Sequence, residues 1–200
     1  MEFNDLLKRR RMVHHFDSRP LPKDVLDRIL ESALHAPSAG FSQGLALIVL
    51  DDLVQVEWFW RIAEGSVPDD GPPVIVLPIP DKRVYLERYS RADKGGPQGA
   101  QAVESGWPVP YWDIDAAMAC MVMLLKAVDE GVGGWFFGMT QGEAELLQTL
   151  AVPEGLRPIG ALGFGYKAPG DRMEGSSVTL PRRSFDHLVH RGRWLLDKET

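Results

Sequence analysis

The sequence contains one cysteine, Cys120, among its 200 residues, so the chain can form no internal disulfide bond. Because Cys120 lies in an apolar run, we expect a thiol packed in the core rather than a nucleophile or a metal ligand. The longest apolar run covers residues 116–125, which is too short to span a bilayer. The N-terminus carries acids before its bases and no long apolar stretch, so we expect no signal peptide and a cytoplasmic protein.

The motifs of several kinds of chemistry are also missing. The sequence has no GxGxxG after a first strand, no Walker loop and no serine in a nucleophile elbow. The pairs His14-His15 and His187/His190 lack the carboxylates that would complete a metal site. The formal net charge of -6 argues against nucleic-acid binding, which needs a basic face. We therefore expect no metal and no nucleic-acid partner, and expect a bound cofactor to carry any chemistry.

Hydrophobic periodicity predicts both helices and strands. Helices are expected at residues 2–9, 22–36, around 58–60, at 111–130, 141–150 and near 188–195. Strands are expected at residues 45–50, 73–79, 131–139 and 159–166. The 45–50 run is apolar throughout, which predicts a strand buried on both faces. Three consecutive aromatics, Trp58-Phe59-Trp60, cannot all face one core, so at least one is expected to line an interface or a pocket.

Two stretches bear on assembly and on access to a site. Residues 116–125 are apolar on every side, so the helix that contains them must be buried all round. A chain of this length rarely provides such a place, so the pattern predicts a dimer interface. Residues 90–110 are rich in glycine, proline and polar side chains, which predicts a loop. A loop of that length is either a lid over an active site or a surface insertion.

A basic cluster follows the first expected helix. The run Lys8-Arg9-Arg10-Arg11 is followed by two histidines and the apolar ring of Phe16. Cations at the end of a helix complement its macrodipole, so a solvated helix end is one explanation. A bound anion, such as the phosphate of a flavin, is the other. A second basic pair, Arg182-Arg183, lies near the opposite end of the chain.

Landmarks of one protein family occur along the chain in order. They are Arg10-Arg11-Met12-Val13-His14-His15-Phe16-Asp17, Ala36-Pro37-Ser38-Ala39-Gly40-Phe41-Ser42-Gln43, Asp115, Gly131-Val132-Gly133 through Gly138, Gly165-Tyr166-Lys167-Ala168-Pro169 and Arg182-Arg183-Ser184-Phe185. With this set the chain resembles the FMN-dependent nitroreductase family over nearly its whole length. The resemblance implies a single α+β domain over residues 1–200, with a central, mostly antiparallel sheet flanked by helices. It also implies an intertwined homodimer with two FMN sites at the interface, in which residues 182–200 wrap around the partner.

The resemblance assigns the phosphate end of the FMN site. Arg10 and Arg11 match the family's N-terminal basic pair, which holds the phosphate and ribityl oxygens by charge-assisted hydrogen bonds. Arg182, with Arg183 as a second candidate, matches the C-terminal arginine that clamps the same phosphate.

The ring end of the site is assigned in the same way. Pro37, Ser38 and Ala39 match the loop that packs on the flavin ring from the partner chain. The backbone of Phe137, Gly138 and Met139 matches the segment whose amide points at the flavin N5. Since backbone does this work, the side chains there can vary.

Four more positions of the implied site depart from the family pattern or flank a departure: Met12, His14, Phe41 and Gln43. Met12 stands where the family usually has serine, and His14 where it has arginine or lysine near the flavin pyrimidine. A histidine can stabilise negative charge there only when it is protonated. Phe41 begins the run that replaces the family's Asn-Ser-Gln-Pro-Trp, and Leu180 replaces a lysine.

The implied activity is transfer of hydride from NAD(P)H through FMN to a flat acceptor such as a nitroaromatic or a quinone. Five aromatics are candidates for the pocket wall: Phe41, Trp107, Tyr111, Trp112 and Phe137. The departures keep other flavin chemistry open, namely flavin fragmentation, dehalogenation and dehydrogenation of a substrate. A protein that only binds or stores flavin is a further alternative, and a structural dimer without cofactor is a remote one.

Overall fold

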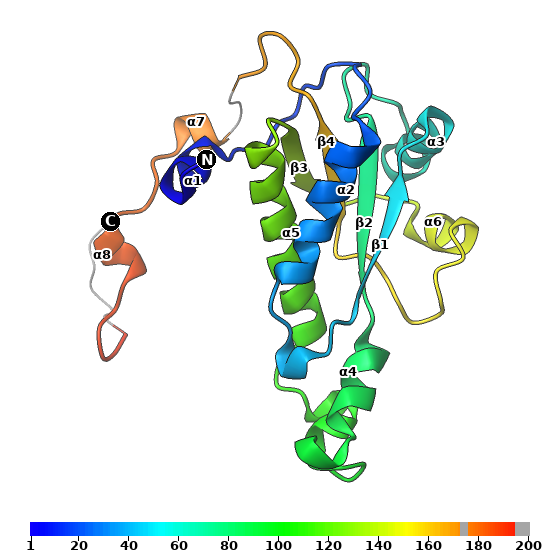
Figure 1. The fold of residues 1–200 in the computed structure, drawn as a ribbon, viewed down its shortest axis with the longest axis vertical. Helices are drawn as coiled ribbons and strands as arrows, with labels where there is room; N and C mark the ends of the chain where they lie inside the picture. The colour runs from blue at the N-terminus through cyan, green and yellow to red at the C-terminus, as the bar shows by residue number, and fades with distance from the viewer. Residues whose placement is uncertain (173–175, 195–200) are drawn as a thin grey trace.

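A four-stranded antiparallel sheet, in the order β1-β2-β4-β3, lies at the centre of the molecule (Figure 1). The computed structural model describes residues 1–172 and 176–194. The strands are β1 (Leu45–Leu50), β2 (Val74–Pro80), β3 (Gly133–Phe137) and β4 (Ala161–Gly165). All four confirm strands expected from the sequence, and the sheet confirms the mostly antiparallel α+β prediction.

The two continuous apolar strands differ in their burial. β2 lies between β1 and β4, and all of its residues are buried. β1 lies at the edge of the sheet, where Ala46 is exposed and only Leu50 is fully buried. The prediction that residues 45–50 are buried on both faces is therefore wrong, because the covering helices lie over the centre of the sheet.

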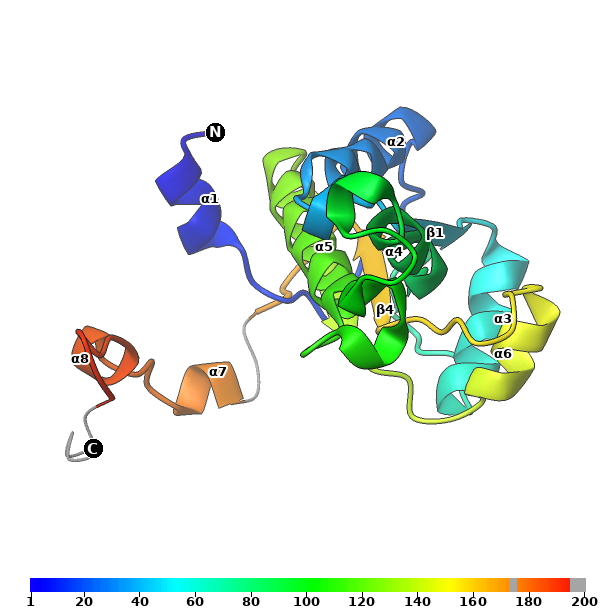
Figure 2. The same cartoon turned by 90° about the horizontal axis from the view of Figure 1, so that it is seen from below.

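Helices cover both faces of the sheet, which makes three layers (Figure 2). On one face, α2 (Lys23–Glu31) and α5 (Tyr111–Asp129) pack through Ile29 and Met123 against Val76 and Phe164. On the other, α3 (Leu53–Glu64) and α6 (Glu143–Thr149) build a second core on Ile75 and Leu77. Helix α2 continues as a 3₁₀ turn, Ser32–His35, so the predicted 22–36 helix is present but changes pitch.

The core explains two features of the sequence. Cys120 is 3% exposed within the first core, which confirms the packed thiol, and burial raises its pKa to about 12. A Cβ placed on Gly134 would lie 2.6 Å from Cδ2 of Leu124, so a larger residue there would displace this buried side chain of α5. A Cβ on Gly163 would lie 2.5 Å from Cγ of Pro72, so the absence of a side chain lets Pro72 pack directly on β4.

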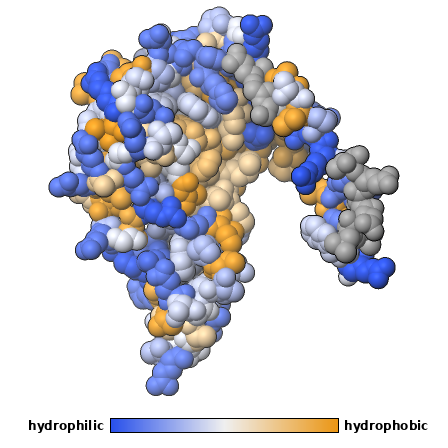
Figure 3. Space-filling model, turned by 180° about the vertical axis from the view of Figure 1, so that it is seen from behind, coloured by the Kyte–Doolittle hydropathy of each residue, from blue (hydrophilic) through white to orange (hydrophobic). Residues whose placement is uncertain are grey.

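One face of α5 remains open in the single chain. Ile114, Met118 and Met121 are 41%, 36% and 44% exposed, so the expected burial on all sides is not met within one chain. Their spacing places them on one side of the helix. Figure 3 shows apolar side chains, in orange, gathered on the side of the body that faces the C-terminal segment.

Residues 90–110 form a projection together with α4 (Lys82–Tyr89), at the lower end of Figure 1. Three short 3₁₀ turns, Ala92–Lys94, Ala100–Ala102 and Glu104–Gly106, give the segment its shape. Trp107 closes it by packing edge-on against Tyr89, with ring centroids 4.6 Å apart, and by donating from Nε1 to the Gln101 carbonyl. The segment is thus a folded projection, and its role as lid or insertion stays a prediction.

The N-terminal helix and the C-terminal segment extend away from the body (Figures 1 and 2). The first is α1 (Phe3–Arg9), and the second contains α7 (Ser176–Thr179) and α8 (Phe185–Leu188). We call residues 176–194 the arm. Its exposed apolar residues are Val178, Leu180, Phe185, Leu188 and Trp194. Residues 195–200 of the predicted wrapping segment lie outside the described residues. Among the described residues, no helix is long and apolar enough to cross a membrane.

Candidate functional site

The basic segment that follows α1 lies along the free edge of β3. Met12 forms a parallel bridge with Gly134, and the Val13 amide donates to the Gly134 carbonyl at 3.1 Å. The Phe136 amide lies 3.4 Å from the Met12 sulfur, so Met12 packs on the strand where a serine would present a hydroxyl. This pairing carries the chain past β3 and places His14 beside Trp135.

His14 and the end of β3 share a pocket of about 340 Å³, which we call the β3 pocket. Its aromatic wall is stacked: Trp135 and Phe137 lie 4.3 Å apart, and Phe137 and Trp60 lie 5.2 Å apart at an interplanar angle of 8°. The remaining lining residues are Glu64, Ser66, Pro68, Gly71, Gly138 and Thr140. Trp60 confirms that one member of the aromatic triplet lines a pocket.

No packing contact within the chain requires a glycine at position 138, which lines the β3 pocket. A Cβ built on Gly138 would meet no atom of the described chain within 4 Å. Met139, the next residue, instead packs against the second core. The backbone at Gly138 is thus open to a ligand, and a flat group could approach it closely.

The loop of Pro37, Ser38 and Gln43 lines a different cavity, of about 120 Å³, between α2, β1 and α5. Asp115 lies in its wall and is 6% exposed. One oxygen of this carboxylate accepts from the Ala39 amide at 2.7 Å and from the Tyr85 hydroxyl at 2.8 Å. Burial, together with the hydrogen bond to Asp115, raises the pKa of Tyr85 above its usual value. Asp115 therefore fixes the loop, a role that its position at the start of an apolar helix only hinted at.

The same loop presents Phe41 outward in an unusual backbone conformation. Gly40, Phe41 and Gln43 have φ angles of 62°, 55° and 56°, a backbone conformation that residues other than glycine rarely adopt. Phe41 is 72% exposed. Arg88 holds the turn by donating to the Gly40 carbonyl at 3.0 Å. Backbone strain of this kind persists where the surroundings fix it, and it is concentrated at functional sites.

The four predicted phosphate ligands occupy different surroundings. Within the described residues, the half-buried Arg10 makes no ion pair, whereas Arg11 pairs with Asp171. Arg182 and Arg183 are exposed on the arm. The arm stands away from β3 in the single chain (Figure 1), so one chain does not bring the two basic pairs together.

The structure thus divides the predicted site into parts. His14, Phe137 and Gly138 meet in the β3 pocket, and Pro37, Ser38 and Gln43 meet at the second cavity. Of the other candidate aromatics, Trp107 and Trp112 pack with Tyr85, at 6.2 Å each, and so belong to the base of the projection. No group of three or more metal-ligating side chains was found in the part of the chain that the structure describes.

Comparison with known proteins gives consistent matches. The sequence model of the Nitroreductase family matches residues 7–166. An NADPH-dependent oxidoreductase of Staphylococcus aureus is 26% identical over 198 residues, which cover 98% of this chain and 75% of that protein. The solved structure of the NfrA1 nitroreductase from B. subtilis superposes with a TM-score of 0.75 at 17% identity, covering 98% of this chain and 76% of that one. A nitroreductase family protein from Clostridium difficile gives a TM-score of 0.71 at 21% identity, covering 97% and 100%.

Proposed function

The chain belongs to the nitroreductase family and is an oxidoreductase, and we propose that it uses FMN to pass hydride from NADPH or NADH to a flat acceptor. When bound, FMN supplies the ring atom that takes hydride from the nicotinamide and gives it to a nitroaromatic or a quinone. The β3 pocket, where His14 and Phe137 meet the open backbone at Gly138, is the observation that carries this proposal. The NADPH-dependent relative supports the choice of donor.

The residues of the β3 pocket fit a flavin ring. The space beside Gly138 lets a flat ring approach the backbone, and the stacked Trp135 and Phe137 provide a flat apolar wall. An amide of the 137–139 backbone would donate to the ring nitrogen. His14 would lie near the pyrimidine, where its protonated form stabilises negative charge and its neutral form does not. Met12 would pack near the flavin without offering the hydroxyl group that the family's serine provides.

A homodimer would complete the site. The loop of Pro37, Ser38 and Ala39 lies at a cavity separate from the β3 pocket, so it would reach a flavin ring only from a second copy. Phe41 and Gln43 would reach the partner's flavin site together with that loop. The exposed face of α5 and the exposed apolar residues of the arm supply the surfaces that a partner would bury. The resemblance extends the wrapping segment over residues 182–200. Arg182 and Arg183 would reach the phosphate when the arm wraps around the partner.

The proposal is tested first by the colour of the protein. Purified protein should be yellow, and the pigment released by heat should co-elute with FMN in chromatography. Anaerobic mixing with NADPH or NADH should bleach it, and menadione or nitrofurazone should restore the colour. A yellow protein that neither nicotinamide bleaches would favour flavin storage or another donor, as the His14 and Phe41 departures allow. A colourless protein that takes up no FMN would end the proposal.

Arg10→Ala tests the phosphate end of the site. A charge-assisted hydrogen bond contributes about 1.5–3 kcal/mol, so FMN affinity should fall roughly 10- to 100-fold, measured by fluorescence titration. Riboflavin, which lacks the phosphate but keeps the ribityl chain, should lose less affinity than FMN does. Lys8→Ala is the matched control, since Lys8 is an exposed cation of α1. Equal FMN affinity in the Arg10→Ala variant and the native protein would remove Arg10 from the site.

A further inference from the structure

Arg11 is occupied by contacts within its own chain. Its Nη2 atom donates both to the Oδ2 of Asp171 and, at 3.2 Å, to the Asp171 carbonyl. Nη1 donates to the Met12 carbonyl at 3.4 Å. The guanidinium thus has three acceptors that are all protein atoms, so its hydrogen-bonding geometry is set before any ligand arrives.

Asp171 is poorly placed to lose this partner. Its side chain is 1% exposed, and its second oxygen, Oδ1, is buried with no hydrogen-bond partner among the described residues. A carboxylate taken out of water and paired with one arginine depends on that arginine for charge compensation. A phosphate that drew Arg11 away would leave a buried, unpaired charge behind.

Asp171 also lies where the chain leaves the body for the arm. The Asp17 amide donates to the Tyr166 carbonyl at 2.8 Å, and the Ala168 amide donates to the His15 carbonyl at 3.0 Å. These bonds align residues 166–168 with residues 15–17, and the pair of Arg11 with Asp171 is the last described contact before the arm. The ion pair therefore fixes Asp171, which precedes the arm in the chain, against the basic segment.

From these contacts we infer that Arg11 is a positioning residue: with Asp171 it forms a latch that sets the direction in which the arm leaves the body. Arg10 remains the phosphate ligand of the N-terminal pair. The inference rests on the proposed function only where it concerns FMN. There, the latch acts by holding the arm so that Arg182 and Arg183 reach the phosphate in the dimer.

The latch and the direct-ligand alternative predict opposite effects of one substitution. If Arg11 bound the phosphate and Asp171 merely competed for it, Asp171→Asn would free the guanidinium and tighten FMN binding. If the two form a latch, Asp171→Asn and Arg11→Ala should both weaken FMN binding, each by roughly tenfold, and the double variant should lose no more than either single one. Tighter binding by Asp171→Asn, or additive losses in the double variant, would overturn the inference.

A second measurement does not depend on flavin. Trypsin cleaves after arginine, and the arm carries Arg182, Arg183, Arg191 and Arg193. Mass spectrometry of limited digests of the dimer should show these sites cut roughly tenfold faster in Arg11→Ala and in Asp171→Asn than in the native protein. A misdirected arm would dock less on the partner, and cleavage follows the undocked population. Unchanged rates would overturn the latch, even in a protein that binds no FMN.

Three controls separate the latch from general damage to the fold. Arg9→Ala removes an exposed neighbouring cation and should change neither FMN affinity nor cleavage of the arm. Arg11→Lys keeps the charge but loses the fork of donors, so its cleavage rate should lie between those of the native protein and Arg11→Ala. The exchanged pair Arg11→Asp with Asp171→Arg should restore slow cleavage if circular dichroism shows a native fold. Fast cleavage in a folded exchanged pair would count against the latch.

Discussion

A single carboxylate holds the loop that we propose to contact the flavin. Asp115→Ala would leave the Ala39 amide and the Tyr85 hydroxyl without their acceptor. A buried polar group left unpaired costs about 1–3 kcal/mol, so the free energy of unfolding in urea should fall by roughly that amount for each of the two groups. FMN affinity should fall as well, because the loop loses its anchor.

Two variants make the Asp115 prediction specific. Asp115→Asn keeps an oxygen that can accept both hydrogen bonds, so it should retain most of the stability lost in Asp115→Ala. Asp113→Ala removes a carboxylate two residues away, whose only described ion pair, with Arg157, is long at 3.9 Å. It should be nearly neutral, since a pair this exposed contributes little. An Asp115→Ala protein as stable as Asp113→Ala would show that the loop is held by other contacts.

At the scale of the elements, apolar patterning predicted all four strands and the long helices, because period and length separate them. The sequence does not predict helix α4, because half of the residues in Lys82–Tyr89 are charged and they form no clear apolar stripe. Asp81 caps the helix by accepting from the Arg83 amide. The sequence also could not predict that β1 lies at the edge of the sheet, because a run of apolar residues does not indicate which strands pair with it. Pairing order is a long-range property that only the folded chain reveals.

The candidate site shows the same limit. Motif order identified His14 and residues 137–139, and the structure brings His14, Phe137 and Gly138 to one pocket. Trp60 and Thr140 share that pocket but belong to no motif, because their positions follow from how α3 packs on the sheet. The contacts of Asp115 and Arg11 could not be foreseen either, since their partners lie 76 and 160 residues away in the sequence.

The exposed face of α5 should be an interface. Met121→Glu places a charge in the middle of this face, so dimer affinity should fall by at least about tenfold. Sedimentation velocity over a range of micromolar concentrations measures this shift toward monomer. Val54→Glu is the control, since Val54 is 74% exposed on α3, away from α5. If the Met121→Glu protein sediments as a dimer at every concentration at which the native protein does, the α5 interface is wrong.

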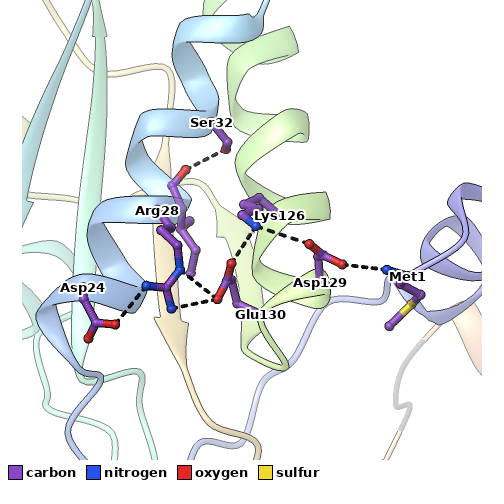
Figure 4. A network of polar contacts seen from close by, with 8 residues as sticks. Met1, Asp24, Arg28, Ser32, Lys126, Asp129 and Glu130 are labelled. Atoms are coloured by element: carbon purple, nitrogen blue, oxygen red, sulfur yellow. Dashed lines mark hydrogen bonds and ion pairs between the residues drawn. The ribbon is translucent and has the colours of Figure 1, made fainter.

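At the scale of the whole molecule, a chain of charges joins three distant segments (Figure 4). Glu130, just after α5, accepts from Arg28 of α2 at 3.0 Å and pairs with Lys126. Asp129 accepts from the N-terminal ammonium of Met1 at 3.2 Å. Each pair is exposed and contributes little alone, but together they tie the start of the chain and α2 to the same end of α5.

This network predicts a pH dependence of stability. The hydrogen bond from Arg28 and, second, that from Lys126 hold the pKa of Glu130 below its usual value of 4.5. A carboxylate with a lowered folded-state pKa stabilises the protein above its unfolded pKa, and this contribution is lost as the pH falls through the folded value. The melting temperature of Glu130→Gln should therefore fall less than that of the native protein between about pH 5 and pH 3. Glu57→Gln, which removes an exposed i,i+4 pair with Arg61, is the matched control for the loss of one surface carboxylate. Parallel melting curves for Glu130→Gln and the native protein across this range would show that the network does not contribute to acid stability.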